Sequence, residues 1–464
     1  MKKILALVMV FVMLCSMSGC CCCLPSGEMT EDMVDIFEEV FESIEDAMLE
    51  LDISGTKRPG DWGSIFGPGN DVGQKPNADS EKLEQERGAT LKIMIPGLNP
   101  DDSTTWQYEV FEDFRSQYPM VELEFVRTSW SDWENKLVAT YEAGSHIDVL
   151  YSSVNSNPLL PILGYTQPLR DYVDLENPNL HKTTMEACFQ YGGEIYVAST
   201  ETNFGVIYYN KDMIRACGRK DPMDLYKAGK WNWNTFAEYA YRLTDHKEGV
   251  YGFATEYPYL FYGANATSTL KFEDGKYYLN TDDHAFKEAL RLISDGWCVS
   301  RWQGWEGSAM TSFQMNQAAM LGSFSQYELE VNQLSEIYGW DPINYGVVPL
   351  PTGPSNYEGY NMVHSAGYSI GTDSDCPNHA GKLIDMLING QAEYQARQEQ
   401  RLPADSVWLY QEMSNRMYCV NTRDSAIDGG RALYEAVCSG YNPEAAIQMT
   451  EHQYQSVLNQ IQGE

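Results

Sequence analysis

Basic residues are scarce in this chain of 464 residues. Lys and Arg number 32 against 66 Asp and Glu, and the formal net charge at pH 7 is -34. Proteins that bind nucleic acid need a basic face to neutralise phosphates, so the composition argues against nucleic acid as a partner. The acidic balance also argues against anionic ligands.

Recognisable catalytic motifs are lacking as well. The seven histidines are widely spread, and no GxSxG, HExxH, P-loop or dinucleotide-binding motif stands between an expected strand and an expected helix. We therefore expect no enzyme, no cofactor and no metal site. A lipid-anchored glycoside hydrolase that works through two carboxylates remains the enzyme alternative, because 66 acidic residues leave room for such a pair.

Long apolar runs are missing except at the N-terminus. Lys2 and Lys3 precede an unbroken apolar stretch over residues 4–14. This order is typical of a bacterial secretory signal. The stretch is too short to remain in a bilayer as a spanning helix.

The residues around Cys20 resemble the bacterial lipoprotein box, because Ser18 and Gly19 directly precede the Cys. In that family the thiol is acylated before cleavage, and the Cys becomes the mature N-terminus. The resemblance implies a signal peptide over 1–19, a lipidated Cys20 that starts a tether over 20–26, and a location on the extracellular face of the cytoplasmic membrane. Met17 departs from the usual Leu, and an ordinary signal peptide with incidental cysteines is the alternative.

The remaining cysteines follow no recognisable framework. Cys21, Cys22 and Cys23 fit either reversible acylation or a redundant acceptor for the lipid. Six more are scattered without CxxC spacing: Cys188, Cys217, Cys298, Cys376, Cys419 and Cys438. An even number in an exported chain allows disulfides, but the pairing cannot be read, and buried free thiols are the alternative.

Residues 27–52 read as one acidic helix with an apolar stripe from Met33 to Leu51. The helix is either a solvated spacer or a surface that docks on the protein body or a partner helix. Its like charges disfavour self-association, so we expect a monomer. Residues 53–88 are dense in Gly, Pro, Asn and Asp, which predicts a flexible linker.

Folded structure is expected to begin at residues 89–97, a short apolar run that suits a buried strand. A helix over 108–119, a strand over 121–127, a helix over 131–144 and a strand over 147–153 follow. This alternation predicts parallel strands covered by helices. Ligands bind at the carboxyl ends of such strands, here Pro96 and Gly97, Thr128 to Trp130, and Ser152 and Ser153.

From residue 89 onward, seven stretches resemble the extracellular solute-binding proteins of carbohydrate ABC importers, in that family's order. They include "FRSQYPMVELEFVRTSWSDWENKLVATYEAGSHIDVLYSS", "GGEIYVASTETNFGVIYYNKDMI", "WNWNTFAEYAYRLTD", "SFQMNQAAMLGSF" and "INYGVVPLPTGPS". "AGYSIGTDSDCPNHAGKLIDMLIN" and "GYNPEAAIQ" complete the set. The resemblance does not extend to residues 27–88.

The resemblance implies an α/β fold of two lobes, a periplasmic-binding-protein-like fold with hinge crossings and a ligand cleft between the lobes. Lobe one would comprise residues 89–203 and 357–405, and lobe two residues 208–352 and 410–464. The crossings would fall near 204–208, 351–357 and 404–408. The partners implied are a carbohydrate, with an oligosaccharide preferred to a monosaccharide, and the permease subunits of an ABC importer.

Sugar hydroxyls need fixed hydrogen-bond partners, and sugar C–H faces stack on flat apolar rings. Strand ends and loops therefore supply the candidate ligand-binding residues: Trp106, Trp130, Ser152, Ser153, Asn203, Trp302, Trp305, Phe324 and Tyr360. Asn203 and Phe324 rest on the resemblance, because relatives often place a polar contact and a stacking ring there. Trp231 and Trp233 are expected to pack at a helix start instead. A surface adhesion or sensory lipoprotein is the alternative to transport.

Overall fold

The computed structural model describes residues 80–130, 132–154, 156–273, 276–304, 308–414, 417–419 and 430–462. The expected signal peptide, Cys20 and the acidic helix over 27–52 lie outside these residues. Trp305 lies outside them as well. Helix α5 (Trp133–Glu142) clusters apart from the rest of the described chain and is therefore considered by itself.

The first three strands of lobe one pair as the alternating pattern predicts. β1 (Thr90–Met94) lies between β2 (Glu122–Phe125) and β3 (Val149–Ser153), and both pairings are parallel. Ile93 stands opposite Phe125 on one side and Val149 on the other. The carboxyl ends of the three strands therefore meet at one edge of the sheet.

Two long strands complete this sheet from distant parts of the chain. β12 (Asn361–Gly371) runs antiparallel between β3 and β7 (Ala198–Asn210). The short strands β4 (Thr166–Gln167) and β13 (Met417–Cys419) also pair with β12. The order along the main path is β10-β7-β12-β3-β1-β2, so strands that are adjacent in space are rarely adjacent in sequence.

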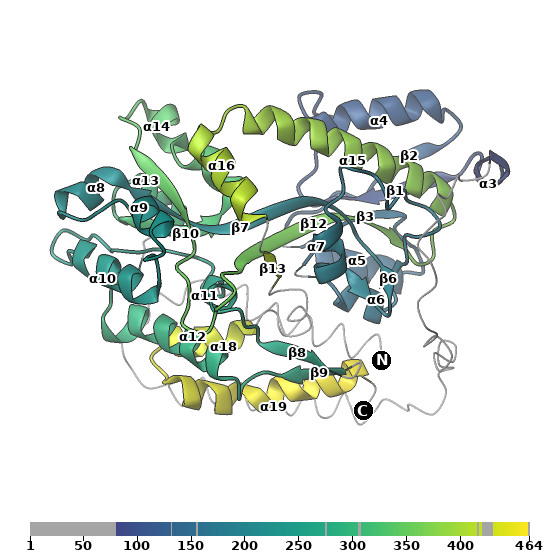
Figure 1. Cartoon of the computed structure of the whole chain (residues 1–464). Coiled ribbons are helices and arrows are strands. Elements are labelled where there is room, and N and C mark those ends of the chain that lie inside the picture. Colours follow the sequence, from purple (N-terminus) through teal and green to yellow (C-terminus); the bar gives the residue numbers. More distant parts are fainter. Residues whose placement is uncertain are drawn as a thin grey trace, which may run out of the picture. The chain divides into compact units, whose positions relative to one another are not determined.

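Strand β7 belongs to both lobes. Its first part pairs with β12 as far as Phe204 opposite Val363, and its second part pairs with β10 (Met320–Phe324) from Gly205 onward. β11 (Tyr345–Pro349) pairs with the same second part. Figure 1 shows β7 running from the β12 side of the fold to the β10 side. The partners of β7 therefore change between two consecutive residues.

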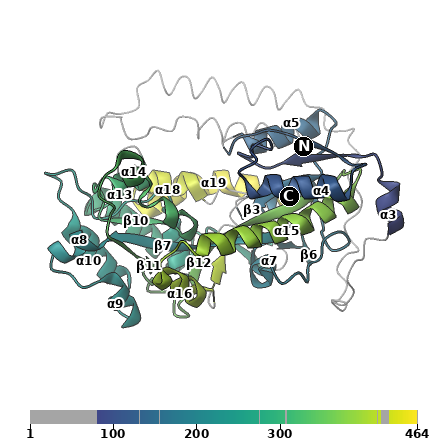
Figure 2. The ribbon, with the colours of Figure 1, turned by 90° about the horizontal axis from the view of Figure 1, so that it is seen from above.

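Two helices cover one face of the lobe-one sheet. α4 (Trp106–Gln117) begins at Thr105, whose side chain accepts a hydrogen bond from the Tyr108 backbone N–H. α15 (Pro377–Glu399) runs beside α4 in both ribbon views (Figures 1 and 2). The apolar stripes of the two helices bury Phe111, Phe114, Leu383 and Leu387 in one core with the inward residues of β1 and β3.

Lobe two has a separate aromatic core. α10 (Trp233–Leu243) starts after Asn232, which accepts a hydrogen bond from the Thr235 backbone N–H. Trp231 and Trp233 are both buried in this core, as expected for residues that pack at a helix start. The helices around the core are α10, α11 (Leu260–Ala264), α12 (His284–Ser294), α18 (Arg431–Cys438) and α19 (Pro443–Gln462).

The remaining elements are short. Those in the first part of the chain are α3 (Ser80–Gln85), α6 (Leu159–Ile162), α7 (Lys182–Cys188), β5 (Gln190–Tyr191), β6 (Glu194–Ile195), α8 (Lys211–Ala216) and α9 (Pro222–Lys227). Those in the second part are β8 (Leu270–Glu273), β9 (Lys276–Leu279), the π-helix η2 (Asp295–Val299), α13 (Ala309–Gln314), the 3-10 helix η3 (Ser325–Glu330), α14 (Gln333–Tyr338) and α16 (Ala404–Met413). None of the helices in the described ranges is long and apolar enough to cross a membrane.

Two expectations are refined by the structure. The stretch predicted as linker up to residue 88 contains α3, and Glu86 after it is hydrogen-bonded to Asn378 and His379. Local Gly and Pro content could not reveal this anchor, because its partners lie 292 and 293 residues away in the sequence. Among the cysteines, Cys188 is disulfide-bonded, whereas Cys217, Cys298, Cys376 and Cys438 are free.

Candidate functional site

Five polar or aromatic residues share one face of the sheet where β3, β12 and β7 lie side by side. Ala366 of β12 stands opposite Ser153 of β3 and opposite Glu201 of β7, and His364 stands opposite Asn203. Side chains two residues apart along a strand point to the same face. The residues that share this face are Tyr151, Ser153, Glu201, Asn203 and His364, here called the sheet-face cluster.

Glu201 is the hydrogen-bond centre of the sheet-face cluster. The Tyr151 hydroxyl donates to one carboxylate oxygen at 3.3 Å, and Gln391 Nε2 of α15 donates to the other at 3.2 Å. Burial raises the pKa of Glu201 above its ordinary value, although hydrogen bonds from Tyr151 and Asn203 act in the opposite direction. Burial and the nearby Glu201 also raise the pKa of Tyr151. The cluster therefore presents a partly buried acid with neutral hydrogen-bonding neighbours.

Trp130 lies at the expected strand-end position and contacts this cluster. Its ring meets the Tyr151 ring edge-on, with centroids 5.5 Å apart, and the side chain is 63% exposed. A Cβ at Gly97 would lie 2.9 Å from Trp130 Nε1, so the Trp130 ring rests against the backbone at the end of β1. The Gly97 backbone N–H also donates to the Thr128 carbonyl at 2.9 Å. An exposed indole that is fixed in place by its own lobe is a platform for stacking.

Lobe two adds aromatic side chains to the same region. The Phe324 ring contacts the His364 ring at 5.5 Å and the Tyr257 ring at 5.3 Å between centroids. Tyr327 of η3 lies near enough to Tyr151 of lobe one to contribute to the raised pKa of Tyr151. Burial lowers the pKa of His364 to about 4, so its imidazole is neutral at pH 7.

A small cavity opens beside these rings. Its volume is about 150 Å³. Carboxylates, hydroxyls and a thioether line it: Glu256, Tyr257, Met310, Ser323, Tyr327 and Glu330. Tyr257 lines the cavity and contacts the Phe324 ring. The Phe324 ring in turn contacts His364 of the sheet-face cluster. Side chains from both lobes therefore contact one another beside β7, the strand that the two lobes share.

The structure separates the expected site residues into two groups. Trp130, Ser153, Asn203 and Phe324 lie together at or beside the sheet-face cluster. Ser152 points to the opposite face, where it is fully buried and its Oγ has no hydrogen-bond partner among the described residues.

The other candidates lie elsewhere. Trp106 is 8% exposed and stacks on Tyr394 of α15, so it packs in the lobe-one core. Trp302 is 1% exposed and meets Phe236 and Phe253 edge-on in the lobe-two core. A Gly-punctuated loop led us to expect an accessible ring at Trp302, but the ring fills the interior instead. Tyr360 is 38% exposed in the connection before β12, and its backbone N–H donates to Asn356 Oδ1 at 2.9 Å.

Four residues of the region escaped the sequence reasoning: Tyr151, Glu201, His364 and Tyr257. Glu201 stands two residues before Asn203 in an extended run, so period two alone would have placed both on one face. His364 and Tyr257 could not be found in this way, because their positions depend on pairings between distant segments.

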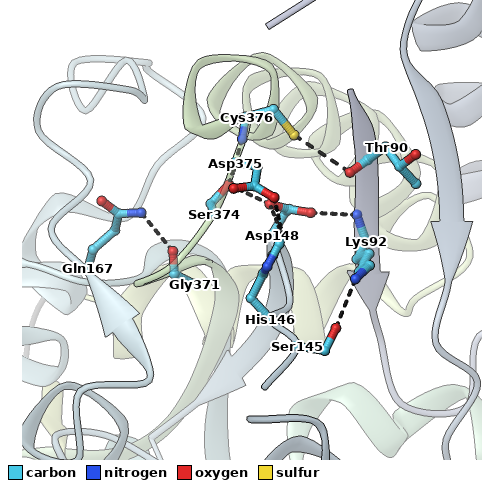
Figure 3. Close-up of polar contacts among 10 residues, drawn as sticks. All are labelled: Thr90, Lys92, Ser145, His146, Asp148, Gln167, Gly371, Ser374, Asp375 and Cys376. Carbon is cyan, nitrogen blue, oxygen red and sulfur yellow. Dashed lines mark hydrogen bonds and ion pairs between the residues drawn. The ribbon is translucent and has the colours of Figure 1, made fainter. Parts of the chain in front are cut away.

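A second polar cluster, at the other end of β3, contains residues typical of catalysis. Asp148 is fully buried and accepts hydrogen bonds from the Lys92 backbone N–H at 2.7 Å and from Ser374 Oγ at 2.5 Å. Figure 3 shows His146 and Asp148 side by side, with Nε2 of His146 3.4 Å from Asp148 Oδ1. Ser374 bonds to the carboxylate and not to the imidazole, so these groups do not form a Ser-His-Asp relay. The cluster joins β1, β3 and the connection after β12.

A larger cavity of about 450 Å³ lies in lobe two, lined by residues that include Arg219, Arg242 and His246. Glu238 pairs with Arg219 at 2.8 Å and with Arg242 at 3.6 Å. No strand end or sheet-face residue lines this cavity. We therefore place the candidate ligand site at the smaller cavity beside the sheet-face cluster, not at this larger one.

A two-lobed α/β fold with side chains from both lobes around a shared strand defines the class of hinged ligand-binding proteins. The model of the bacterial extracellular solute-binding protein family matches residues 97–393. This match covers more than half of the 464 residues, and the chain belongs to that family.

Solved structures show the same fold. An ABC substrate-binding protein from Listeria monocytogenes, in complex with cycloalternan, is 17% identical with a TM-score of 0.63, over 81% of this chain and 99% of that one. The GacH receptor of Streptomyces glaucescens, solved unliganded and with acarbose, is 16% identical with a TM-score of 0.62, over 80% and 99%. MalE from Bdellovibrio bacteriovorus bound to maltotriose is 17% identical with a TM-score of 0.59, over 81% and 100%.

Proposed function

We propose that this protein captures a carbohydrate, an oligosaccharide by class, and delivers it to the permease of an ABC importer. The observation that carries the proposal is the sheet-face cluster with Trp130 on one side and Phe324 on the other. A flat exposed indole suits the C–H face of a sugar, and Glu201 with Asn203 suits its hydroxyls. The fold neighbours crystallised with cycloalternan, acarbose and maltotriose support this ligand class.

The charge around the candidate site supports an uncharged ligand. Glu201, Glu256 and Glu330 are acids, and His364 is neutral at pH 7 because burial lowers its pKa to about 4. An anionic sugar would meet acidic groups there without a compensating cation among the side chains named for the cluster and the cavity. We therefore assign neutral oligosaccharides ahead of acidic ones.

The protein works from the extracellular face of the cytoplasmic membrane in this proposal. Cys20 carries the lipid, and residues 27–79 separate the folded body from the anchor. The protein binds as a monomer, and its partners are the sugar and the permease subunits. Its extracellular family supports export, and the order of residues 1–20 supports the anchor.

A binding screen tests the proposal. A ligand that binds only the folded state raises the unfolding midpoint, so neutral oligosaccharides should raise it while uronic-acid oligosaccharides should not. Chromatography of the incubated sugar checks for turnover in the same samples. Release of shorter sugars would establish the glycoside hydrolase instead. If no sugar in the panel shifts the midpoint or binds in calorimetry, the proposed carbohydrate function is wrong.

A further inference from the structure

Two free cysteines from distant parts of the chain meet in lobe two. Cys298 lies in the π-helix η2, and Cys438 is the last residue of α18. Cys298 Sγ donates to the Cys438 carbonyl oxygen at 3.4 Å and to the Val437 carbonyl oxygen at 3.5 Å. The two residues are 140 positions apart in the sequence, so only the fold brings them together.

The distance to the carbonyl limits how far apart the thiols can be. A carbonyl oxygen lies ~2.4 Å from the Cα of its own residue, from the standard C=O and Cα–C bond lengths. Cys298 Sγ therefore lies within about 6 Å of the Cys438 Cα. The Sγ of a Cys lies ~2.8 Å from its own Cα by standard bond lengths, so the two Cα atoms lie within about 9 Å of each other. This bound includes the 4.4–6.8 Å that is usual for disulfides, and a bridge then needs the two side chains to rotate toward each other. The pKa of Cys438 also reflects the closeness of the two thiols, because burial raises this pKa and the neighbouring Cys298 raises it further.

We propose that Cys298 and Cys438 form a disulfide in the exported protein. Each thiol loses its proton, one S–S bond forms, and the two electrons pass to a small-molecule or protein disulfide, which is reduced to two thiols. The bridge ties α18 to η2, which directly follows α12. Cys188 of the same chain is already disulfide-bonded.

The local environment favours this pair over other thiol partners. Cys298 and Cys438 are both partly buried, which limits access for large oxidants. Burial raises the pKa of both thiols, so thiolate is scarce and reaction with dissolved oxygen is slow. Exchange with a disulfide needs the same thiolate, so it is fastest while the chain folds after export, before the two thiols are buried. Cys217 instead donates to the Arg242 carbonyl at 3.6 Å, and Cys376 lies in lobe one near the Thr90 carbonyl.

Peptide mapping without reduction tests the bridge directly. The full chain is refolded from denaturant in a mixture of oxidised and reduced glutathione, remaining thiols are alkylated in denaturant at low pH, and the protein is digested with trypsin. Cleavage after Arg291, Arg301 and Arg431 places Cys298 in peptide 292–301 and Cys438 in peptide 432–464. We expect one species that joins these two peptides and disappears on reduction, while Cys217 stays alkylated.

Matched variants make the outcome decisive. Cys217→Ser should retain the joined species, and Cys298→Ser or Cys438→Ser should lose it. The same two variants should unfold a few degrees below the oxidised wild type, since a bridge across a long loop restricts the unfolded chain. Recovery of both wild-type peptides only in alkylated form, or only as glutathione adducts, would overturn the proposal. So would a bridge from Cys298 to any other cysteine.

Discussion

Glu86 caps the N-terminus of a helix whose third residue, His379, lies 293 positions later. One carboxylate oxygen of Glu86 accepts from the His379 backbone N–H at 2.9 Å and contacts His379 Nδ1 at 2.8 Å. The other accepts from the Asn378 backbone N–H at 3.0 Å. These amides are among the first of α15 and lack partners within the helix. Negative charge at this end of a helix is stabilising.

Removing this cap should weaken lobe one. A chain that starts at Ala89 should unfold at a lower temperature than a chain that starts at Ser80, and Glu86→Ala should lose about 1–2 kcal/mol of the free energy of unfolding. Calorimetry on the three proteins checks both statements. Glu112→Ala is the control, since among the described residues Glu112 bonds to Arg115 on the exposed surface of the same helix, α4. Equal midpoints for the two chain starts would show that the cap contributes nothing.

The pH dependence of the cap has a defined sign. Burial alone would raise the pKa of Glu86, but the hydrogen bonds from His379 and Asn378 outweigh it and lower the pKa below its ordinary value of 4.5. The stabilisation is therefore complete above pH 4.5 and is lost as the pH falls through the lowered pKa. The difference in unfolding free energy between wild type and Glu86→Gln should shrink over this acidic range.

Trp130 is expected to carry much of the sugar affinity. A stacking ring contributes on the order of 1 kcal/mol beyond its buried area, so Trp130→Ala should weaken binding about tenfold or more without unfolding lobe one. Titration calorimetry with the best ligand of the screen measures the loss. We predict no such loss for Trp340→Ala, an exposed Trp stacked on Tyr338 in lobe two. Wild-type affinity in Trp130→Ala would remove this residue from the site.

Gly97 provides an independent test of the Trp130 platform. Gly97→Ala would place a methyl group 2.9 Å from Trp130 Nε1 and displace the ring. Gly164→Ala is a matched control, since Gly164 has φ of +73° against +72° for Gly97 but nothing within 4 Å of an added Cβ. Both variants should lose similar stability through backbone strain. Gly97→Ala alone should also lose affinity; an equal effect of both on binding would point to strain only.

His364 should make the folded state sensitive to acid. Its pKa is lowered to about 4 by burial, against 6.5 in the unfolded chain, so the unfolded chain takes up a proton first. Stability should fall by about 3 kcal/mol as the pH drops from 6.5 to 4. Glu201 acts in the opposite direction, because burial raises its pKa and protonation then favours the folded state.

The variant His364→Gln isolates this contribution from that of Glu201. Urea unfolding at several pH values should show a shallower acid decline for His364→Gln than for wild type. His284→Gln, at an exposed histidine with a 79% accessible side chain, should follow the wild type. Identical slopes for His364→Gln and wild type would mean that the imidazole is protonated without cost in the folded state.

Ligand binding should close the lobes about the point where β7 changes partners. A ligand that touches Trp130 and Asn203 in one lobe and Phe324 in the other favours the closed form by the difference in its affinity for the two forms. Small-angle scattering should show a smaller radius of gyration with sugar than without. The Trp130→Ala variant should need more sugar for the same contraction. An unchanged radius at saturating sugar would falsify closure.

The sequence predicted the order of β1, α4, β2, α5 and β3 because each element has its own period and its own end signals. Pro119 and Gly144 lie at such ends. The helix expected from residue 108 begins two residues earlier, at Trp106 after Thr105. The parallel pairing of the three strands followed from the helices between them. These features depend on neighbouring residues only, which is why a single sequence reveals them.

The candidate site was harder to predict because it depends on tertiary pairing. Trp130 and Asn203 could be placed from strand ends and from family resemblance, but their neighbour Glu201 looked like any other acid among 66 Asp and Glu. Trp302 lies in a loop without apolar periodicity and still enters the core, since Phe236 and Phe253 from distant segments surround it. Ser152 and Ser153 differ only in the face of β3 that each occupies.

The position of β12 between β3 and β7 has a consequence for how the chain reaches its fold. Until residue 371 has emerged, β3 and β7 both lack β12, the strand that lies between them in the finished sheet. Their unpaired edges are sites for wrong association during that interval. Pairings between segments so far apart also slow folding. A chain that crosses a membrane from its N-terminus would expose these edges outside the cell, where a chaperone that shields strand edges would raise the yield of folded protein.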